Sequence, residues 1–119
     1  MSGTIQNNVI TVRQGDSFAI NIAVRQGCQP VDLTGATVLM QVREKDSGNL
    51  VFAVNGTPVD VLHGKIALLI MPEMTAAQAL GDYVTDIQFT GADGSVNTIF
   101  PADVNKIGTF RITAQVTEV

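Results

Sequence analysis

The sequence contains no tryptophan and only one cysteine, one histidine and one tyrosine among its 119 residues. The single cysteine, Cys28, cannot form a disulfide within the chain, which excludes the cysteine-rich secreted scaffolds. One histidine and one cysteine supply two ligands, whereas a structural zinc site needs about four. We therefore expect neither a metal site nor a cofactor.

Positive charge is also scarce. Seven lysine and arginine residues stand against eleven acidic residues, which gives a net charge of −4. Nucleic-acid binding needs clustered basic residues, so we predict no nucleic-acid partner. No apolar run approaches the roughly 18 residues of a membrane-spanning helix, and residues 1–4 lack the basic end and apolar stretch of a signal peptide. We therefore predict no membrane association and no secretion.

The length predicts a single domain over residues 1–119, because domains usually contain roughly 100–200 residues. Residues 2–8 are polar apart from Ile5. This composition predicts that residues 1–8 form either a flexible arm that orders on a neighbouring protein or a frayed end.

Apolar and polar residues alternate through most of the chain, which is the period of half-buried strands rather than helices. Phe18, Ile20, Ile22 and Val24, for example, share one face of their segment. Strands are predicted at residues 9–13, 18–24, 36–43, 50–54, 65–71, 83–90, 96–100 and 108–117. Short strands at this spacing indicate an all-β fold, an antiparallel β-sandwich.

One segment has a helical signature. Thr75 is suited to begin a turn that covers residues 76–80, and Gly81 is suited to end it in the left-handed conformation. So short a segment cannot form a stable helix alone. We therefore predict one short helical turn near residues 75–80, at a corner between two strands.

The residues after this corner resemble the tyrosine corner of immunoglobulin domains, in which a tyrosine opens a strand two residues before a conserved cysteine. Tyr83 occupies the tyrosine position, and Thr85 occupies the cysteine position. The strand predicted at 18–24 has no partner cysteine either. The alternative is that Tyr83 is simply a half-buried aromatic residue of a strand.

The sequence offers little for catalysis. His63 is the only histidine, and a hydrolase would need it beside Ser17, Ser47 or Ser95 and an orienting carboxylate. None of these serines lies in a G-x-S-x-G motif. We therefore predict no enzyme activity and interpret His63 as a loop or packing residue.

The segment 65–71 is apolar on both faces, unlike a sandwich strand with one face in water. Ala67, Leu69 and Met71 form its second face, and Leu39 is a similar extra hydrophobe in another strand. These four residues predict an interface with a partner subunit. The alternatives are that the corner at residues 74–80 covers them or that the strand is buried at an edge of the sandwich.

Four segments in order carry a resemblance to a known family. They are Gln14–Phe18, Pro30–Val38 with its continuation Gln41–Arg43, Gly81–Gln88, and Asp93–Ile99. This order is similar to the immunoglobulin-like modules of tailed-phage virion proteins, notably the N-terminal domain of baseplate upper proteins. The resemblance spans nearly the whole chain and depends on turn-and-strand patterns.

The resemblance implies an immunoglobulin-like sandwich that is a non-enzymatic structural part of a phage virion, located in the tail, the baseplate or the capsid as an accessory or decoration protein. It implies docking to other phage structural proteins, as a homo-oligomer or on a larger lattice, and it transfers no catalytic residue. Two features depart from the family. Proteins of the family usually continue into a stalk or receptor-binding region, whereas this sequence contains one module. The family also has a glycine just before its last pair of strands, and here only Gly108 is a candidate for that position.

A different class of function is a carbohydrate-binding or host-adhesion module. Such a module needs exposed aromatic rings on which a sugar can stack. Tyr83 and the five phenylalanines lie mostly at positions predicted to face the core. The sequence therefore favours the virion role over this alternative.

Overall fold

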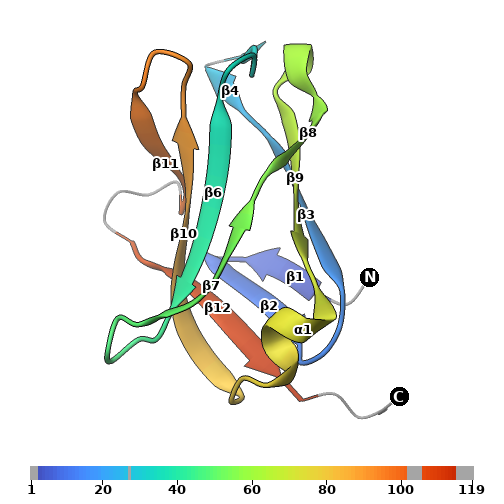
Figure 1. Ribbon diagram of the computed structural model, residues 1–119, viewed down its shortest axis with the longest axis vertical. Coiled ribbons are helices and arrows are strands. Elements are labelled where there is room, and N and C mark those ends of the chain that lie inside the picture. The colour runs from blue at the N-terminus through green and yellow to red at the C-terminus, as the bar shows by residue number, and fades with distance from the viewer. Residues whose placement is uncertain (1–2, 27, 102–105, 115–119) are drawn as a thin grey trace.

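The computed structural model describes residues 3–26, 28–101 and 106–114, and most of them lie in strands of two packed sheets (Figure 1). This arrangement confirms the predicted all-β sandwich. The long strands run roughly parallel to the long axis of the molecule, and the described part of the chain carries its one α-helix at one end (Figure 1).

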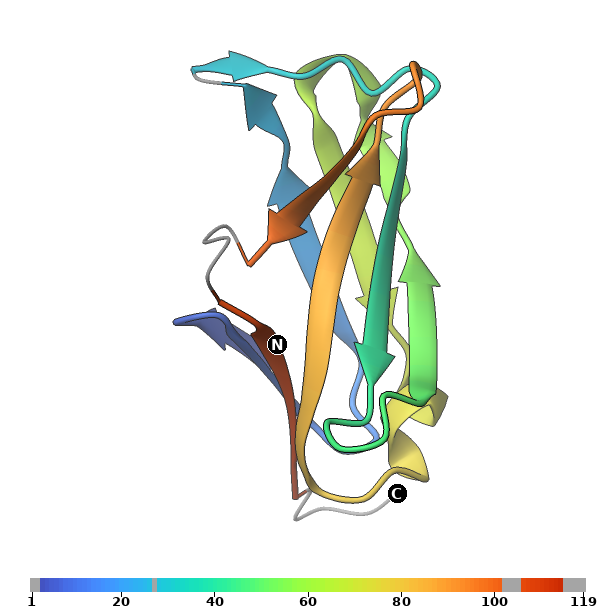
Figure 2. The ribbon, with the colours of Figure 1, turned by 90° about the vertical axis from the view of Figure 1, so that its left-hand side faces the viewer.

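The larger sheet has seven strands in the order β1, β2, β12, β10, β6 and β7, with β11 also paired to β10. Its strands are β1 (Gly3–Gln6), β2 (Val9–Arg13), β6 (Thr37–Arg43), β7 (Leu50–Asn55), β10 (Gly81–Thr90), β11 (Val96–Phe100) and β12 (Gly108–Thr113). The pair β2–β12 is parallel and the other pairs are antiparallel. The first half of β10 pairs with β12 and the second half with β11, so these two strands follow one another beside β10 (Figure 2).

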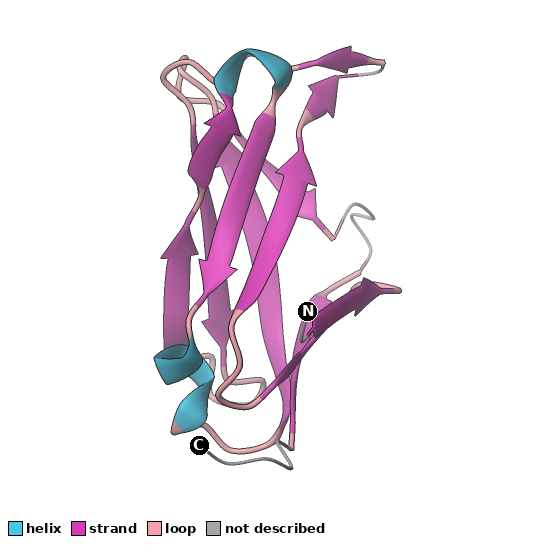
Figure 3. Cartoon of the chain, turned by 90° about the vertical axis from the view of Figure 1, so that its right-hand side faces the viewer, coloured by secondary structure: helices cyan, strands magenta, loops and turns pink. Residues whose placement is uncertain are grey.

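The smaller sheet has three strands in the order β3 (Phe18–Ala23), β9 (Lys65–Ile70) and β8 (Thr57–Asp60). A separate hairpin of β4 (Arg25–Gln26) and β5 (Gln29–Pro30) follows β3, and a 3₁₀ turn, η1 (Val61–His63), joins β8 to β9. Figure 3 shows this sheet face on, with β3 at its edge. The described chain passes from the larger sheet to the smaller one between β2 and β3 and again between β7 and β8.

The core lies between the two sheets and is formed by alternate residues of the strands, as their period predicts. Phe110 is fully buried, and its ring meets Phe52 edge to face at a centroid distance of 5.4 Å. The other fully or almost fully buried side chains include Ile10, Val12, Val38, Met40, Val42, Leu68, Ile70, Ile87 and Ile112. Most of them lie at positions that the alternating pattern assigns to the inward face.

The predicted strands are present, with small differences at their ends. The last one ends at Thr113 rather than at residue 117, and residues 115–117 lie outside the described residues. The structure adds β1, β4, β5 and β8, which the sequence pattern did not predict. Within the segment predicted as an N-terminal arm, Gly3–Gln6 pairs with β2 along its whole length, so these residues form a sheet strand rather than a free arm. Residues 1–2 of that segment lie outside the described residues.

The short helix lies at the predicted corner but begins earlier than predicted. The helix α1 (Pro72–Ala76) starts at a proline, whose fixed φ and missing N–H suit the first turn. Thr75 therefore lies inside the helix and is fully buried, and its Oγ1 accepts a hydrogen bond from the backbone N–H of Gly15 at 2.9 Å. Gly81, predicted to end the helix, is the first residue of β10.

Gly108 lies where only a residue without a side chain fits. A Cβ at this position would stand 2.6 Å from the carbonyl oxygen of Thr85 on the paired strand β10 and 2.9 Å from the ring of Phe100. This close approach accounts for glycine at the first residue of β12.

Candidate docking surfaces

Tyr83 packs in the core with 9% of its surface exposed. Its hydroxyl donates a hydrogen bond to the carbonyl oxygen of Ala79, four residues upstream, at 2.7 Å. This is the contact that characterises a tyrosine corner. Thr85, in the cysteine position of that motif, donates its hydroxyl to the carbonyl of Gln41 at 2.7 Å. This hydrogen bond lies within one sheet, whereas the disulfide of antibody domains joins the two sheets.

We expect Tyr83→Phe to lower the free energy of unfolding by about 1 kcal/mol, because it removes one hydrogen bond and leaves the carbonyl of Ala79 without its partner. Urea unfolding followed by circular dichroism measures this change. Phe89→Leu, at a half-buried position on the same strand, is the control for a loss of packing without a hydrogen bond. A Tyr83→Phe variant as stable as the unmodified chain would contradict a structural role for the hydroxyl.

The four residues predicted to form an interface do not make one surface. Ala67 and Leu69 lie on the outer face of β9, and Met71 follows them directly before α1. Leu39 lies on the outer face of β6, in the other sheet, on the opposite side of the sandwich. Leu69 remains 48% exposed, so the corner at α1 does not cover it. That Leu39, Ala67, Leu69 and Met71 contact a partner stays a prediction, now for two separate surfaces.

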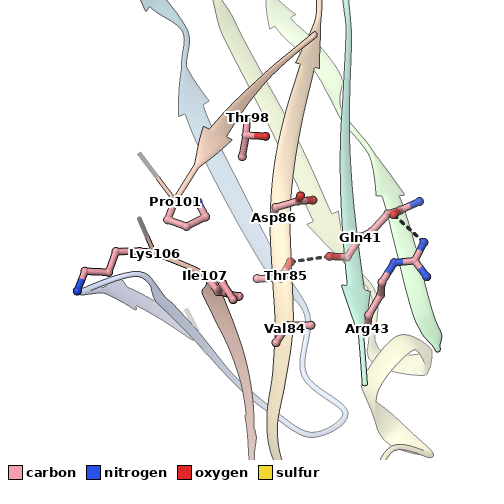
Figure 4. Close-up of a pocket in the computed structure, with 10 residues that line it drawn as sticks. Gln41, Arg43, Val84, Thr85, Asp86, Thr98, Pro101, Lys106 and Ile107 are labelled. Carbon is pink, nitrogen blue, oxygen red and sulfur yellow. Dashed lines mark hydrogen bonds between the residues drawn. The ribbon is translucent and has the colours of Figure 1, made fainter. Parts of the chain in front are cut away.

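The outer face of the larger sheet carries a groove of about 420 Å³ that sequence reasoning did not predict (Figure 4). Val84 and Asp86 of β10 lie along it, with Arg43 of β6 on one side and Lys106 and Ile107 on the other. Ile107 is 76% exposed, the highest fraction among the large hydrophobic residues that the structure describes. Two cations and one carboxylate line the groove of a chain that is negatively charged overall. Its open shape suits a docked protein segment better than an enclosed small molecule.

An ion pair joins β10 to β12 on the same face. Arg111 donates from Nε and Nη2 to the two carboxylate oxygens of Asp82, at 2.7 and 3.1 Å. The two residues are direct cross-strand partners. The hydrogen bond from Arg111 lowers the pKa of Asp82 below its usual value. Both side chains are partly exposed, so we attribute to this pair a role in strand register rather than a large stabilisation.

We expect Arg111→Gln to raise the pKa of Asp82 towards its ordinary value of about 3.9. Because the pKa of Asp82 is lowered in the folded chain, its contribution to stability is present above that ordinary value. The contribution is lost as the pH falls through the lowered pKa. Carboxyl NMR titration measures the change. Asp93, whose pKa is lowered by the backbone N–H and hydroxyl of Ser95, should titrate as before. An unchanged titration of Asp82 would contradict the assignment.

His63 lies on the exposed turn η1, where its Nδ1 stands 3.0 Å from both carboxylate oxygens of Asp60. This contact lowers the pKa of Asp60. Two of the candidate serines, Ser47 and Ser95, hydrogen-bond carboxylates within their own turns instead. The described residues contain no group of three or more histidine, cysteine or acidic side chains that could hold a metal ion. Within the described ranges, the structure thus places His63 beside the carboxylate of Asp60 and gives Ser47 and Ser95 other partners.

The aromatic residues do not form a sugar-binding platform. All six lie in the described ranges, and each is buried or half-buried. Because a sugar ring stacks on an exposed aromatic face, no observation favours the carbohydrate-binding alternative.

Comparison with known proteins identifies the family. The model of the BppU N-terminal domain matches residues 2–99, which is more than four-fifths of the chain. The chain belongs to the BppU N-terminal domain family. This family is the N-terminal domain of the phage baseplate upper protein, so the chain is a bacteriophage baseplate structural domain and a virion component. The family match confirms the resemblance inferred from the turn-and-strand segments. No curated protein sequence matches the chain.

This BppU N-terminal domain is similar to solved structures at low sequence identity, and only the first of those named here supports the shared fold. The N-terminal domain of phage TP901-1 ORF48 is 17% identical, with a TM-score of 0.51 over 88% of this chain and 82% of that one. CopC from Methylosinus trichosporium OB3b is 12% identical, with a TM-score of 0.47 over 92% and 87% of the two chains. Murine CRIg is 12% identical, with a TM-score of 0.41 over 97% and 99%. At these identities a likeness concerns the fold alone.

The two helical segments that the structure describes are η1 and α1, of three and five residues. Neither is long and apolar enough to cross a membrane.

Proposed function

We propose that this domain is a non-enzymatic docking module, which attaches to other structural proteins of its phage. The observation that carries the proposal is the family match over residues 2–99. The surface is consistent with it, because the groove is open and its charged and apolar side chains face outwards. We propose further that the domain acts in several copies, as a homo-oligomer or on the lattice of the baseplate.

Co-expression with the other baseplate structural proteins of the same phage tests this function. We expect the chain to co-purify in a complex whose mass, measured by light scattering after size exclusion, accounts for more than one copy. A chain that stays a free monomer with every baseplate protein and is absent from virions would contradict docking. A complex with one copy would contradict only the proposed copy number.

Charge reversal in the groove tests where docking occurs. Arg43→Glu changes a side chain that is held by hydrogen bonds to Gln41 and Gly48, and it makes the groove acidic. Arg13→Glu carries the same change in net charge at an exposed position that does not line the groove, so it is the matched control for binding at this site. Weakening by Arg43→Glu alone would locate a contact in the groove, and equal effects of both variants would indicate a general response to charge.

A further inference from the structure

The edge strand β3 lacks the features that usually prevent an edge from pairing with another chain. Within the described residues it pairs with β9 on one side and with no strand on the other. Its six residues include no charge and no proline, although charges, prolines and bulges are the usual protection. By contrast, the edge strand β8 contains Pro58, Asp60 and a shift of register, and β1 has only four residues.

The direction of the backbone groups of β3 follows from the residue that comes after it. The N–H of Val24 donates to the carbonyl of Gly64, next to β9, at 2.7 Å. Alternate residues of a strand turn their N–H and C=O groups to opposite sides. The backbone N–H and C=O groups of Ile20 and Ile22 therefore point towards β9. Those of Ala19, Asn21 and Ala23 point towards the free edge. The side chains of these last three residues are exposed on the outer face of the sheet.

A cavity of about 340 Å³ lies beside the end of this edge, between the sheets. Ile22 and Ile99 line it, and both are only partly buried against the core. Arg25 is its one charged lining residue. Figures 2 and 3 show the β4–β5 hairpin and the β1–β2 hairpin projecting past the free edge of β3, one at each end. The free edge thus has a partly apolar cavity at the end where β4 begins.

We propose that one extended segment of another baseplate protein adds as a strand to the free edge of β3, between the two hairpins. Its alternate side chains are apolar and enter the cavity, its outward side chains are small or polar, and a carboxylate lies beside Arg25. The three outward-facing residues of β3 offer about six backbone hydrogen bonds. The inference rests on the proposed docking function.

Two substitutions at Asn21 test the strand addition in complexes formed by co-expression with the other baseplate proteins. Asn21→Pro removes an N–H that faces the free edge and leaves in place every N–H that faces β9. We expect the fold to be retained, because natural edge strands accept proline at such positions. Asn21→Ala is the matched control, because it removes the side chain and keeps the N–H. We expect Asn21→Pro to weaken the complex about tenfold or more and Asn21→Ala to change it little. Arg25→Glu should also weaken it.

Hydrogen exchange of the unsubstituted protein gives a second readout that does not depend on how the variants fold. The amides of Ala19, Asn21 and Ala23 should exchange fast in the free chain and become protected in the complex. A complex that withstands Asn21→Pro, with these amides still unprotected, would overturn strand addition and leave the docking function intact. The absence of any complex would overturn both. Protection that rises with the concentration of the isolated chain would show a second copy on the edge and overturn the proposed occupant.

Discussion

Gly64→Ala is expected to lower the free energy of unfolding by about 2–4 kcal/mol. Gly64 ends the turn η1 with a φ of 71°, which an L-residue adopts only at a cost. A Cβ there would also stand 2.4 Å from the carbonyl oxygen of Val24 and 3.0 Å from that of Val31. Both are backbone atoms in a buried region, so they cannot rotate away as a side chain would. The cost of moving them adds to the cost of the backbone conformation.

Two other glycines separate these two costs. Gly48 and Gly94 also have positive φ, 75° and 86°, but a Cβ at either would have no atom within 4 Å. We expect Gly48→Ala and Gly94→Ala to cost about 1 kcal/mol each, the conformational part alone. Urea unfolding of the three variants measures the difference. If Gly64→Ala proves no more costly than the other two, the close approach of the Val24 carbonyl has no energetic effect.

The surroundings of Gly64 connect this prediction to the docking edge. The Gly64 carbonyl accepts the N–H of Val24, and the Val24 carbonyl accepts the N–H of Val31. These bonds fix where β3 ends and where the β4–β5 hairpin begins. A side chain at Gly64 would therefore disturb one end of the free edge of β3 as well as the stability of the domain.

The sequence predicts the fold well wherever one face of a strand is buried. In β12 and in β3 the alternation is regular, because residues two apart share a face and only one face meets the core. In β8 the run Thr57–Asp60 contains a proline and is largely exposed, so it has no such pattern. The start of α1 was missed because Thr75 resembles a helix cap. The residue that marks the actual start of the helix is Pro72, at its first position.

The candidate surfaces could be predicted only in part. Alternation of apolar and polar residues shows that Ala67 and Leu69 share one face of their strand. It does not show which sheet a strand joins, and Leu39 lies in the larger sheet rather than in the sheet of Ala67 and Leu69. The groove has Arg43 on one side and Lys106, which is distant in sequence, on the other, because β11 and β12 follow one another along β10. The free edge of β3 depends likewise on strand order, and its sequence signal is the absence of charge and proline.

The largest loss of stability is expected for Phe110→Ala, about 3–5 kcal/mol. Phe110 is fully buried in β12, where it lies opposite Tyr83 on β10 and beside Ile10 on the parallel strand β2. Its ring also meets Phe52 at an interplanar angle of 81°. Removing the ring leaves a cavity at the junction of three strands, and the surrounding backbone is held by sheet pairing on both sides. The structure can therefore collapse only partly around the lost volume.

Phe52→Ala is the control, because it removes the other ring of the same pair from a half-buried position. It should cost less than Phe110→Ala, since water can reach part of the vacated space. A small domain has a free energy of unfolding of about 5–15 kcal/mol, so the Phe110→Ala chain should show a much lower urea midpoint or fail to fold at 37 °C. Equal losses for the two variants would mean that the ring pair, rather than the burial of Phe110, determines the stability of this junction.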